Sequence, residues 1–286
     1  ASPNPFGAFA TNKFQFFLWG FLAIVLVLTV LFASMVRRLE LFFEPYLTPL
    51  RQWAPLVARV TLGVCLIACA WYGALFGPEL PLSVFGDWAT AISAVLYISG
   101  ALIVFGVLSI PAGFAALGIF ALAMVQWGWY PLITYANYLG EILFLLLIAY
   151  NARRFKQYAF LILRVCFGAS LIGASVYAKF IHAQLALDVV AQYHLTQYFH
   201  FDPLFIVLGA GIIEFLAGIF IIIGFEIRHT VLFLLFWLTL SLLFFQESVW
   251  PHLVLVGVLV ALFMYGYDRW TVGGRLFNRG KLQPFL

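Results

Sequence analysis

Two carboxylates lie in stretches of the sequence that are otherwise apolar. Glu214 falls within "GAGIIEFLAGIFIIIGFE" and Glu141 within "LGEILFLLL". A charged acid in membrane hydrocarbon is costly, so such a group is expected to be protonated, paired or beside water. Both are candidate catalytic residues that handle protons or contact a quinone. The alternative is a neutral acid that fixes the helix bundle through a hydrogen bond, for Glu214 with Ser170 or Tyr177.

A second set of candidates surrounds the stretch "DVVAQYHLTQYFHFD" at 188–202. These residues are expected to meet on one face of the membrane, as a quinone, proton or partner site: Lys179, His182, His194, His200, Glu247 and His252. The four histidines are also the candidate metal ligands, because imidazole binds transition metals. Their spacings match no known metal motif, and a plain interfacial loop is the alternative interpretation.

The composition explains why these polar residues stand out. The chain is 65% hydrophobic and 9% charged, whereas soluble domains are about one quarter charged. Its apolar runs are continuous rather than alternating, which favours membrane-spanning helices over a β-barrel. The sequence therefore predicts an all-α integral membrane protein. Nine transmembrane helices are expected, at about 14–34, 60–75, 89–107, 112–126, 131–150, 159–177, 204–224, 231–245 and 252–267.

The basic residues predict the orientation of these helices. If the N-terminus is outside, 13 of the 15 Lys and Arg residues fall on the cytoplasmic side, and only Lys13 and Lys179 do not. A bacterial or archaeal cytoplasmic membrane is expected, with the C-terminus in the cytoplasm. Because the charges are spread over separate segments, they suit lipid headgroups and indicate no nucleic-acid partner.

Several residues recur later in the chain at nearly constant separations. Arg59 and Gly63 in "RVTLG" match Arg164 and Gly168 in "RVCFG", 105 residues later. Further matches are found at separations of 118 residues, for Gly100 with Gly218 and Gly106 with Gly224, and of 117 residues, for Gly140 with Gly257 and Tyr150 with Tyr267. The increase from 105 to 118 predicts an insertion in the second copy, which contains 188–202.

The repeats predict a domain organisation. An N-terminal transmembrane helix (1–38) and an interfacial linker (39–58) precede two four-helix units, at 59–157 and 158–270, and a cytoplasmic tail follows at 271–286. Each unit has an even number of spans, so both enter the membrane from the same side and are parallel.

The second unit resembles the DoxX family of four-helix membrane proteins. The resemblance is carried by the Arg164-x-x-x-Gly168 start, by Lys179, by "GAGIIEFLAGIFIIIGFEIR" and by the closing "YDRW". The first unit has the same start, Arg59-x-x-x-Gly63, and the matching glycines Gly100 and Gly106. It has Leu96 where the repeat would place Glu214. The resemblance implies tandem DoxX-like units and membrane subunits of quinone-linked redox complexes.

The leading functional hypothesis is thus a DoxX-like subunit of a larger respiratory-type complex, with quinone as the possible cofactor. The chain carries no haem, dinucleotide or P-loop motif, so other membrane or soluble subunits are expected to supply the redox centres. Whether the chain is itself an enzyme stays open. The alternatives are an accessory subunit at the edge of a respiratory or photosynthetic assembly, and a small-solute or proton transporter.

Overall fold

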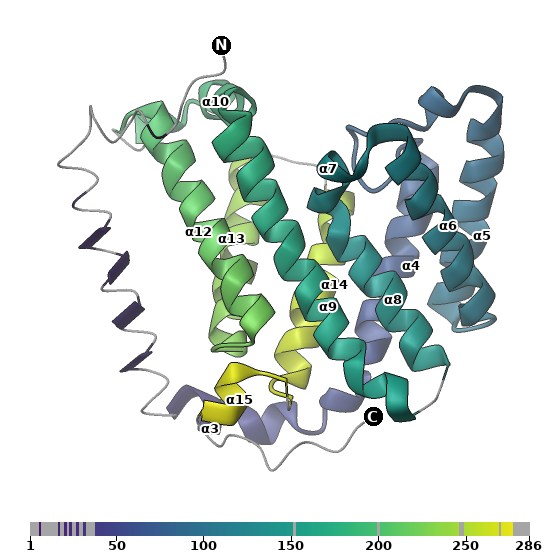
Figure 1. The fold of residues 1–286 in the computed structure, drawn as a ribbon, viewed down its shortest axis with the longest axis horizontal. Coiled ribbons are helices and arrows are strands. Elements are labelled where there is room, and N and C mark those ends of the chain that lie inside the picture. The colour runs from purple at the N-terminus through teal and green to yellow at the C-terminus, as the bar shows by residue number, and fades with distance from the viewer. Residues whose placement is uncertain are drawn as a thin grey trace.

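The computed structural model is all-helical in the part of the chain that it describes (Figure 1). That part comprises 38–150, 153–198, 201–245, 249–268 and 270–276, with isolated positions between 6 and 32. Among these residues, six helices are long and apolar enough to cross a membrane, and two shorter apolar helices accompany them. The chain is a multi-pass membrane protein by these criteria. The expected span at 14–34 falls largely outside the described residues.

Four long helices form one side of the molecule, blue and teal in Figure 1. They are α4 (Ala54–Tyr72), α5 (Ala89–Phe105), α6 (Ser109–Trp127) and α8 (Ala136–Ala149), and α8 is preceded by the short α7 (Trp129–Leu132) and η4 (Ile133–Tyr135). Helix α4 begins earlier than the expected start at 60. The reason is that Pro55 lies in its first turn, where no N–H needs an intrahelical partner.

The other side, green and yellow in Figure 1, contains four further helices. They are α9 (Arg153–Ala174), α12 (Pro203–Ile223), α13 (Ile227–Phe245) and α14 (Val249–Tyr265). A π-helical segment, η5 (Ser175–Ile181), continues α9, and a short α15 (Val272–Leu276) follows α14.

Helices within each side approach closely where glycines face each other. A Cβ on Gly63 would come within 2.7 Å of the Gly100 carbonyl oxygen, and a Cβ on Gly100 within 2.6 Å of the Gly63 carbonyl oxygen. The corresponding distances between Gly168 and Gly218 are 2.6 and 2.8 Å. Without side chains at these positions, the backbones of α4 and α5, and of α9 and α12, pack directly against each other.

The two sides contact each other through the first and the last long helix of each side. Helix α8 packs on α9, and α14 packs on α4. A Cβ on Gly140 of α8 would lie 2.6 Å from the Cβ of Cys166, and one on Gly257 of α14 would lie 1.9 Å from the hydroxyl oxygen of Thr61. The last helix of each side therefore packs against the first helix of the other.

The expectation of a loop at 188–202 is wrong for most of that segment. The chain forms α10 (Ala183–Gln192) and α11 (Leu195–Tyr198) there. Val190, Leu195 and Val207 make a small apolar cluster that joins these helices to α12. Val190 and Leu195 thus give the inserted segment an apolar face that packs against α12. We call the end of the bundle that carries these helices the α10 end (Figure 1).

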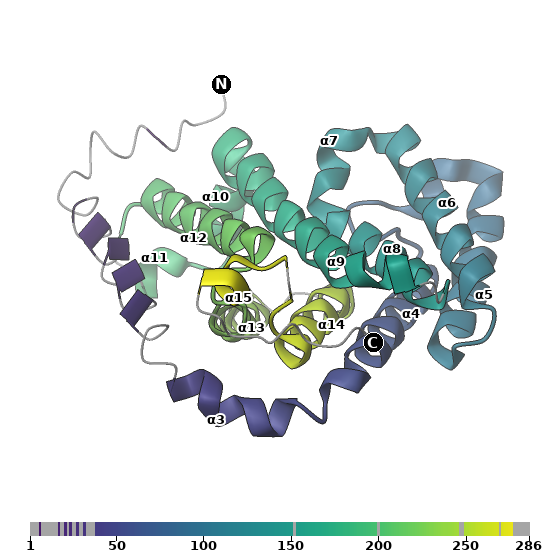
Figure 2. The ribbon, with the colours of Figure 1, turned by 60° about the horizontal axis from the view of Figure 1, so that its bottom comes forward.

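The opposite end, which we call the α3 end, is bordered by α3 (Arg38–Leu47), and Figure 2 shows this helix running along the edge of the bundle. A turn and the short η2 (Arg51–Trp53) connect α3 to α4. Pro45 lies inside α3 rather than breaking it. The segment predicted as an interfacial linker is thus largely helical.

Helix α3 is held to the bundle by ion pairs at Glu44. One carboxylate oxygen accepts from Arg228 Nη1 at 2.7 Å, and the other accepts from Arg51. Burial raises the pKa of Glu44, but the hydrogen bonds and charges of the two arginines lower it by more, so that its pKa lies below the ordinary value of 4.5. The carboxylate therefore stabilises the docked α3 in its charged form.

We expect Glu44→Gln to lower the stability of the purified protein by about 0.5–1 kcal/mol at neutral pH, since the pair is partly exposed. The depressed pKa of Glu44 means that its contribution is fully present above pH 4.5 and is lost as the pH falls through the folded value. Thermal unfolding in detergent should show a difference between wild type and variant at pH 7 that shrinks toward pH 4. A difference that is the same at both pH values would contradict the ion-pair explanation.

Candidate functional site

Glu214, the acid in the middle of α12, forms an ion pair with Lys179 of η5. Lys179 Nζ donates to Glu214 Oε2 at 2.6 Å. The two side chains retain 19% and 17% of their exposure, so the pair is neither sealed in the core nor open to solvent. Pairing offsets much of the cost of placing either charge among apolar helices. The two candidate residues therefore form a single site.

Local backbone features bring these two residues together. Ser175, at the start of η5, donates its hydroxyl to the Gly211 carbonyl at 2.7 Å. A Cβ on Gly211 would lie 2.6 Å from the Phe180 ring and 3.3 Å from the Cβ of Lys179, so the glycine lets η5 lie directly on α12. Glu214 follows Gly211 by three residues and lies on the same face. The close approach thus positions the carboxylate beside the ammonium.

The π-helical turn of η5 also arranges aromatic residues near the pair. The His182 N–H donates to the Tyr177 carbonyl at 3.0 Å, five residues back, as a π-helix requires. The Tyr177 ring lies 4.7 Å from the His182 ring and 5.3 Å from the Tyr130 ring, measured between centroids. Tyr177 and His182 therefore flank the turn that carries Lys179, and His182 is exposed at the α10 end.

The expected partners of Glu214 were wrong. Ser170 instead donates to the Thr134 carbonyl and lies 3.1 Å from Asn137 Oδ1. Tyr177 makes the ring contacts described above. Because Ser170 and Thr134 join α9 to η4, the hydroxyl stabilises the contact between the two sides of the molecule rather than the candidate site.

Glu141 is more deeply buried than Glu214, with 1% of its surface exposed. The Thr61 hydroxyl lies 3.5 Å from Glu141 Oε1, but that hydroxyl lies closer to the Val57 carbonyl, at 2.9 Å. The second oxygen of Glu141 has no hydrogen-bond partner in the described part of the chain. Glu141 thus lies in the packed core, and no described Lys or Arg forms an ion pair with it, which gives it a different environment from Glu214.

The histidines are distributed over separate elements. His182 precedes α10, His194 lies between α10 and α11, and both are exposed. His252 lies at the start of α14, which packs on α4 and α13, whereas α10 packs on α12 and η5. His200 and Glu247 fall outside the described residues. Within the described ranges, no three His, Cys, Asp or Glu side chains are close enough to bind a metal ion.

Comparison of the chain with models of protein families, with curated proteins and with solved structures found no match. The class is therefore defined by the fold and composition alone, as a multi-pass membrane protein that is all-helical in its described part, with a partly accessible ion pair between the middle of α12 and η5.

Proposed function

We propose that the chain is a membrane subunit of a quinone-linked redox complex, and that Lys179 and Glu214 contact the quinone headgroup. The observation that carries the proposal is the 2.6 Å ion pair, which is partly accessible on otherwise apolar helices. Ionisable residues within membrane-spanning helices are costly, so they are candidates for functional sites. Their position beside a π-helical turn supports this reading, because such turns are frequent at functional sites.

The two side chains have the donors and acceptors that a quinone headgroup needs. The Lys179 ammonium has three N–H groups and gives one to Glu214, so others can be donated to a quinone carbonyl. The other Glu214 oxygen, Oε1, can accept a proton from a quinol hydroxyl. A bound quinone would supply the electron-transfer chemistry, and partner subunits would supply the remaining redox centres.

We also propose the tandem arrangement of two DoxX-like units, 59–157 and 158–270, after an N-terminal span. The support is that equivalent residues make equivalent contacts. Gly63 meets Gly100 as Gly168 meets Gly218, and the contact of Gly140 with Cys166 matches that of Gly257 with Thr61. On the charge asymmetry of the sequence, the α3 end is cytoplasmic and the α10 end is outside.

The proposed function is tested by the quinone content of the complex purified from its native membrane. We expect Glu214→Gln and Lys179→Gln each to reduce bound quinone about tenfold, since each replaces a charged hydrogen-bonding group by a neutral one, which makes a weaker hydrogen bond. Lys156→Gln is the matched control, because it removes a lysine at the opposite end of the same helical segment. Native-like elution of each variant on size exclusion establishes that it is folded.

Wild-type quinone content in both site variants would contradict the proposal. A complex that contains no quinone in any form, with the partner subunits still bound, would instead favour the accessory-subunit alternative.

A further inference from the structure

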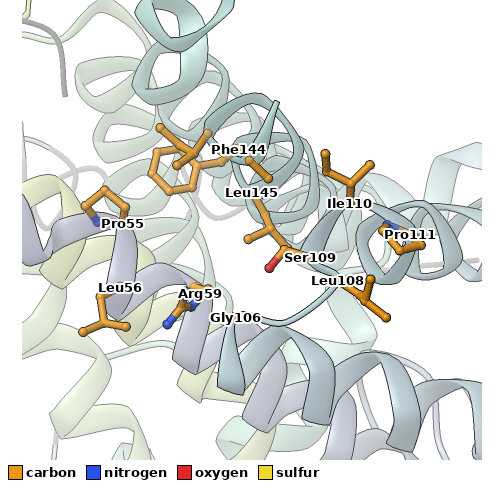
Figure 3. Close-up of a pocket in the computed structure, with 12 residues that line it drawn as sticks. Pro55, Leu56, Arg59, Gly106, Leu108, Ser109, Ile110, Pro111, Phe144 and Leu145 are labelled. Atoms are coloured by element: carbon orange, nitrogen blue, oxygen red, sulfur yellow. The ribbon is translucent and has the colours of Figure 1, made fainter. Parts of the chain in front are cut away.

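A cavity of about 520 Å³ opens at the α3 end between α4, α6 and α8 (Figure 3). Its walls are mainly apolar, with Leu56, Ile110 and Ile148 among the lining residues. Arg59 contributes the one lining cation and Ser109 a hydroxyl at the first position of α6. Figure 3 shows their polar groups facing the same space. The cavity thus combines one positive charge with an apolar interior.

The charge of Arg59 has no counter-charge in the described part of the chain. Its guanidinium lies against Gly106, where a Cβ would come within 2.3 Å of Nη1, so the glycine makes room for it. Its Nε is buried, and no hydrogen-bond partner for it is found among the described residues. A partly buried guanidinium in an apolar cavity is favoured by an anion beside it.

The second side of the molecule contains the same arrangement with an anion in place. A Cβ on Gly224 would come within 2.2 Å of Arg164 Nη1, as one on Gly106 would for Arg59. The residues two positions later, Leu108 and Glu226, both have a positive φ, at 48° and 45°. These matching details support the correspondence of the two arginines that the sequence spacing predicts.

At Arg164 the chain covers the arginine itself. The segment after α14 brings Asp268 to 3.9 Å from Nη1, and the Trp270 carbonyl accepts from Nη2 at 3.4 Å. Thr271 closes the space over Gly224, where a Cβ would be 2.7 Å from its Cγ2. The Arg164 side chain is only 2% exposed as a result. The closing segment therefore supplies a carboxylate beside Arg164, whereas the matching Arg59 lines an open cavity.

The sequence explains why the first side cannot close its cavity in this way. Tyr150 matches Tyr267, so the position that matches Asp268 is occupied by Asn151, which carries no charge. An anion for Arg59 must therefore come from outside the equivalent segment.

We propose that this cavity binds an anionic phospholipid, with the headgroup phosphate at Arg59 and Ser109 and an acyl chain along the apolar walls. The cavity lies at the ends of membrane-spanning helices, where lipid phosphates are found. Its apolar lining suits a lipid better than a soluble anion, which would need several polar contacts. The inference does not depend on the quinone proposal, because it concerns the opposite end of the molecule.

Binding of phosphatidylglycerol and phosphatidylcholine to the delipidated full chain in detergent tests this inference by native mass spectrometry. We expect the wild type to prefer phosphatidylglycerol and Arg59→Gln to weaken that binding about tenfold, as for loss of a charge-assisted hydrogen bond. Lys156→Gln removes a charge from the same end without touching the cavity, and should bind as the wild type does. Ala149→Trp, which fills the cavity but keeps Arg59, should also weaken binding.

Three results would overturn the inference. They are equal binding of the two lipids by the wild type, unchanged phosphatidylglycerol binding in Arg59→Gln, and an equal loss in Lys156→Gln. Inorganic phosphate serves as a further probe. If phosphate alone raises the melting temperature in an Arg59-dependent way and phosphatidylglycerol does not, the cavity takes a soluble anion and the lipid assignment is wrong.

Discussion

Gly218→Ala is expected to destabilise the protein by about 1–3 kcal/mol, the usual cost of overpacking a tight contact. The added Cβ would come within 2.8 Å of the Gly168 carbonyl oxygen and 2.7 Å of the Ile172 side chain. A flexible side chain can move, but the backbone of α9 can yield only if the two helices separate. The contact between α9 and α12 would therefore loosen along its length.

Gly209 on the same helix provides the matched control, because nothing lies within 4 Å of its Cβ position. Gly209→Ala should leave stability unchanged or raise it slightly, since alanine favours a helix over glycine. Thermal unfolding of both variants in detergent, followed by circular dichroism, measures the difference. Equal melting temperatures would show that α9 and α12 do not pack through these glycines.

Asp268→Asn is the second change with a large expected effect. The variant keeps an oxygen that can accept from the Trp270 N–H, as Asp268 does at 2.7 Å, but it removes the charge beside Arg164. Breaking a buried ion pair costs about 3–5 kcal/mol because the remaining charge is unpaired. We expect about 3 kcal/mol here, since the 3.9 Å separation is that of an ion pair rather than a hydrogen bond.

Asp87 is exposed in the segment before α5, and Asp87→Asn serves as the control for loss of one negative charge. The apparent melting temperature should fall in Asp268→Asn and stay constant in Asp87→Asn. A double variant that replaces both Arg164 and Asp268 by apolar residues should recover much of the loss, because neither charge is then left unpaired. No loss in Asp268→Asn would mean that other groups neutralise Arg164.

The spans of the fold were largely predictable, because long apolar runs have few alternatives. The expected range 204–224 agrees with α12 (Pro203–Ile223), and 89–107 agrees with α5 (Ala89–Phe105). The insertion was not predictable as helix, since its histidines and aspartates are typical of wet loops, while Val190 and Leu195, the two buried apolar residues that pack it onto Val207 of α12, are easily overlooked. The π-helical turn at η5 has no sequence signal that distinguishes it from an α-helix.

Both members of the ion pair were among the residues singled out from the sequence, but their contact was not predicted. Lys179 and Glu214 are lone charges in apolar runs and were both candidates, but they were placed in different sets, and Ser170 or Tyr177 was the expected partner of Glu214. The pairing itself joins residues 35 positions apart and depends on Gly211, whose role only the packing reveals. The pair of Glu44 with Arg228 spans 184 positions, and no local pattern indicates it.

The packing of the last helix of each side against the first helix of the other has a consequence for biosynthesis. Cys65 on α4 donates its S–H to the Trp250 carbonyl on α14 at 3.4 Å, across 185 positions of the chain. At about 5–20 residues per second, a ribosome needs roughly ten to forty seconds to add that length. During this interval α4 is in the membrane without α14. The surface of α4 around Thr61, which later packs on Gly257 of α14, must then be covered by lipid or by an insertion factor. The contact between α4 and α14 thus forms only after α14 has been made, and a ribosome that stalls before α14 leaves an intermediate whose α4 surface is accessible to quality-control proteases.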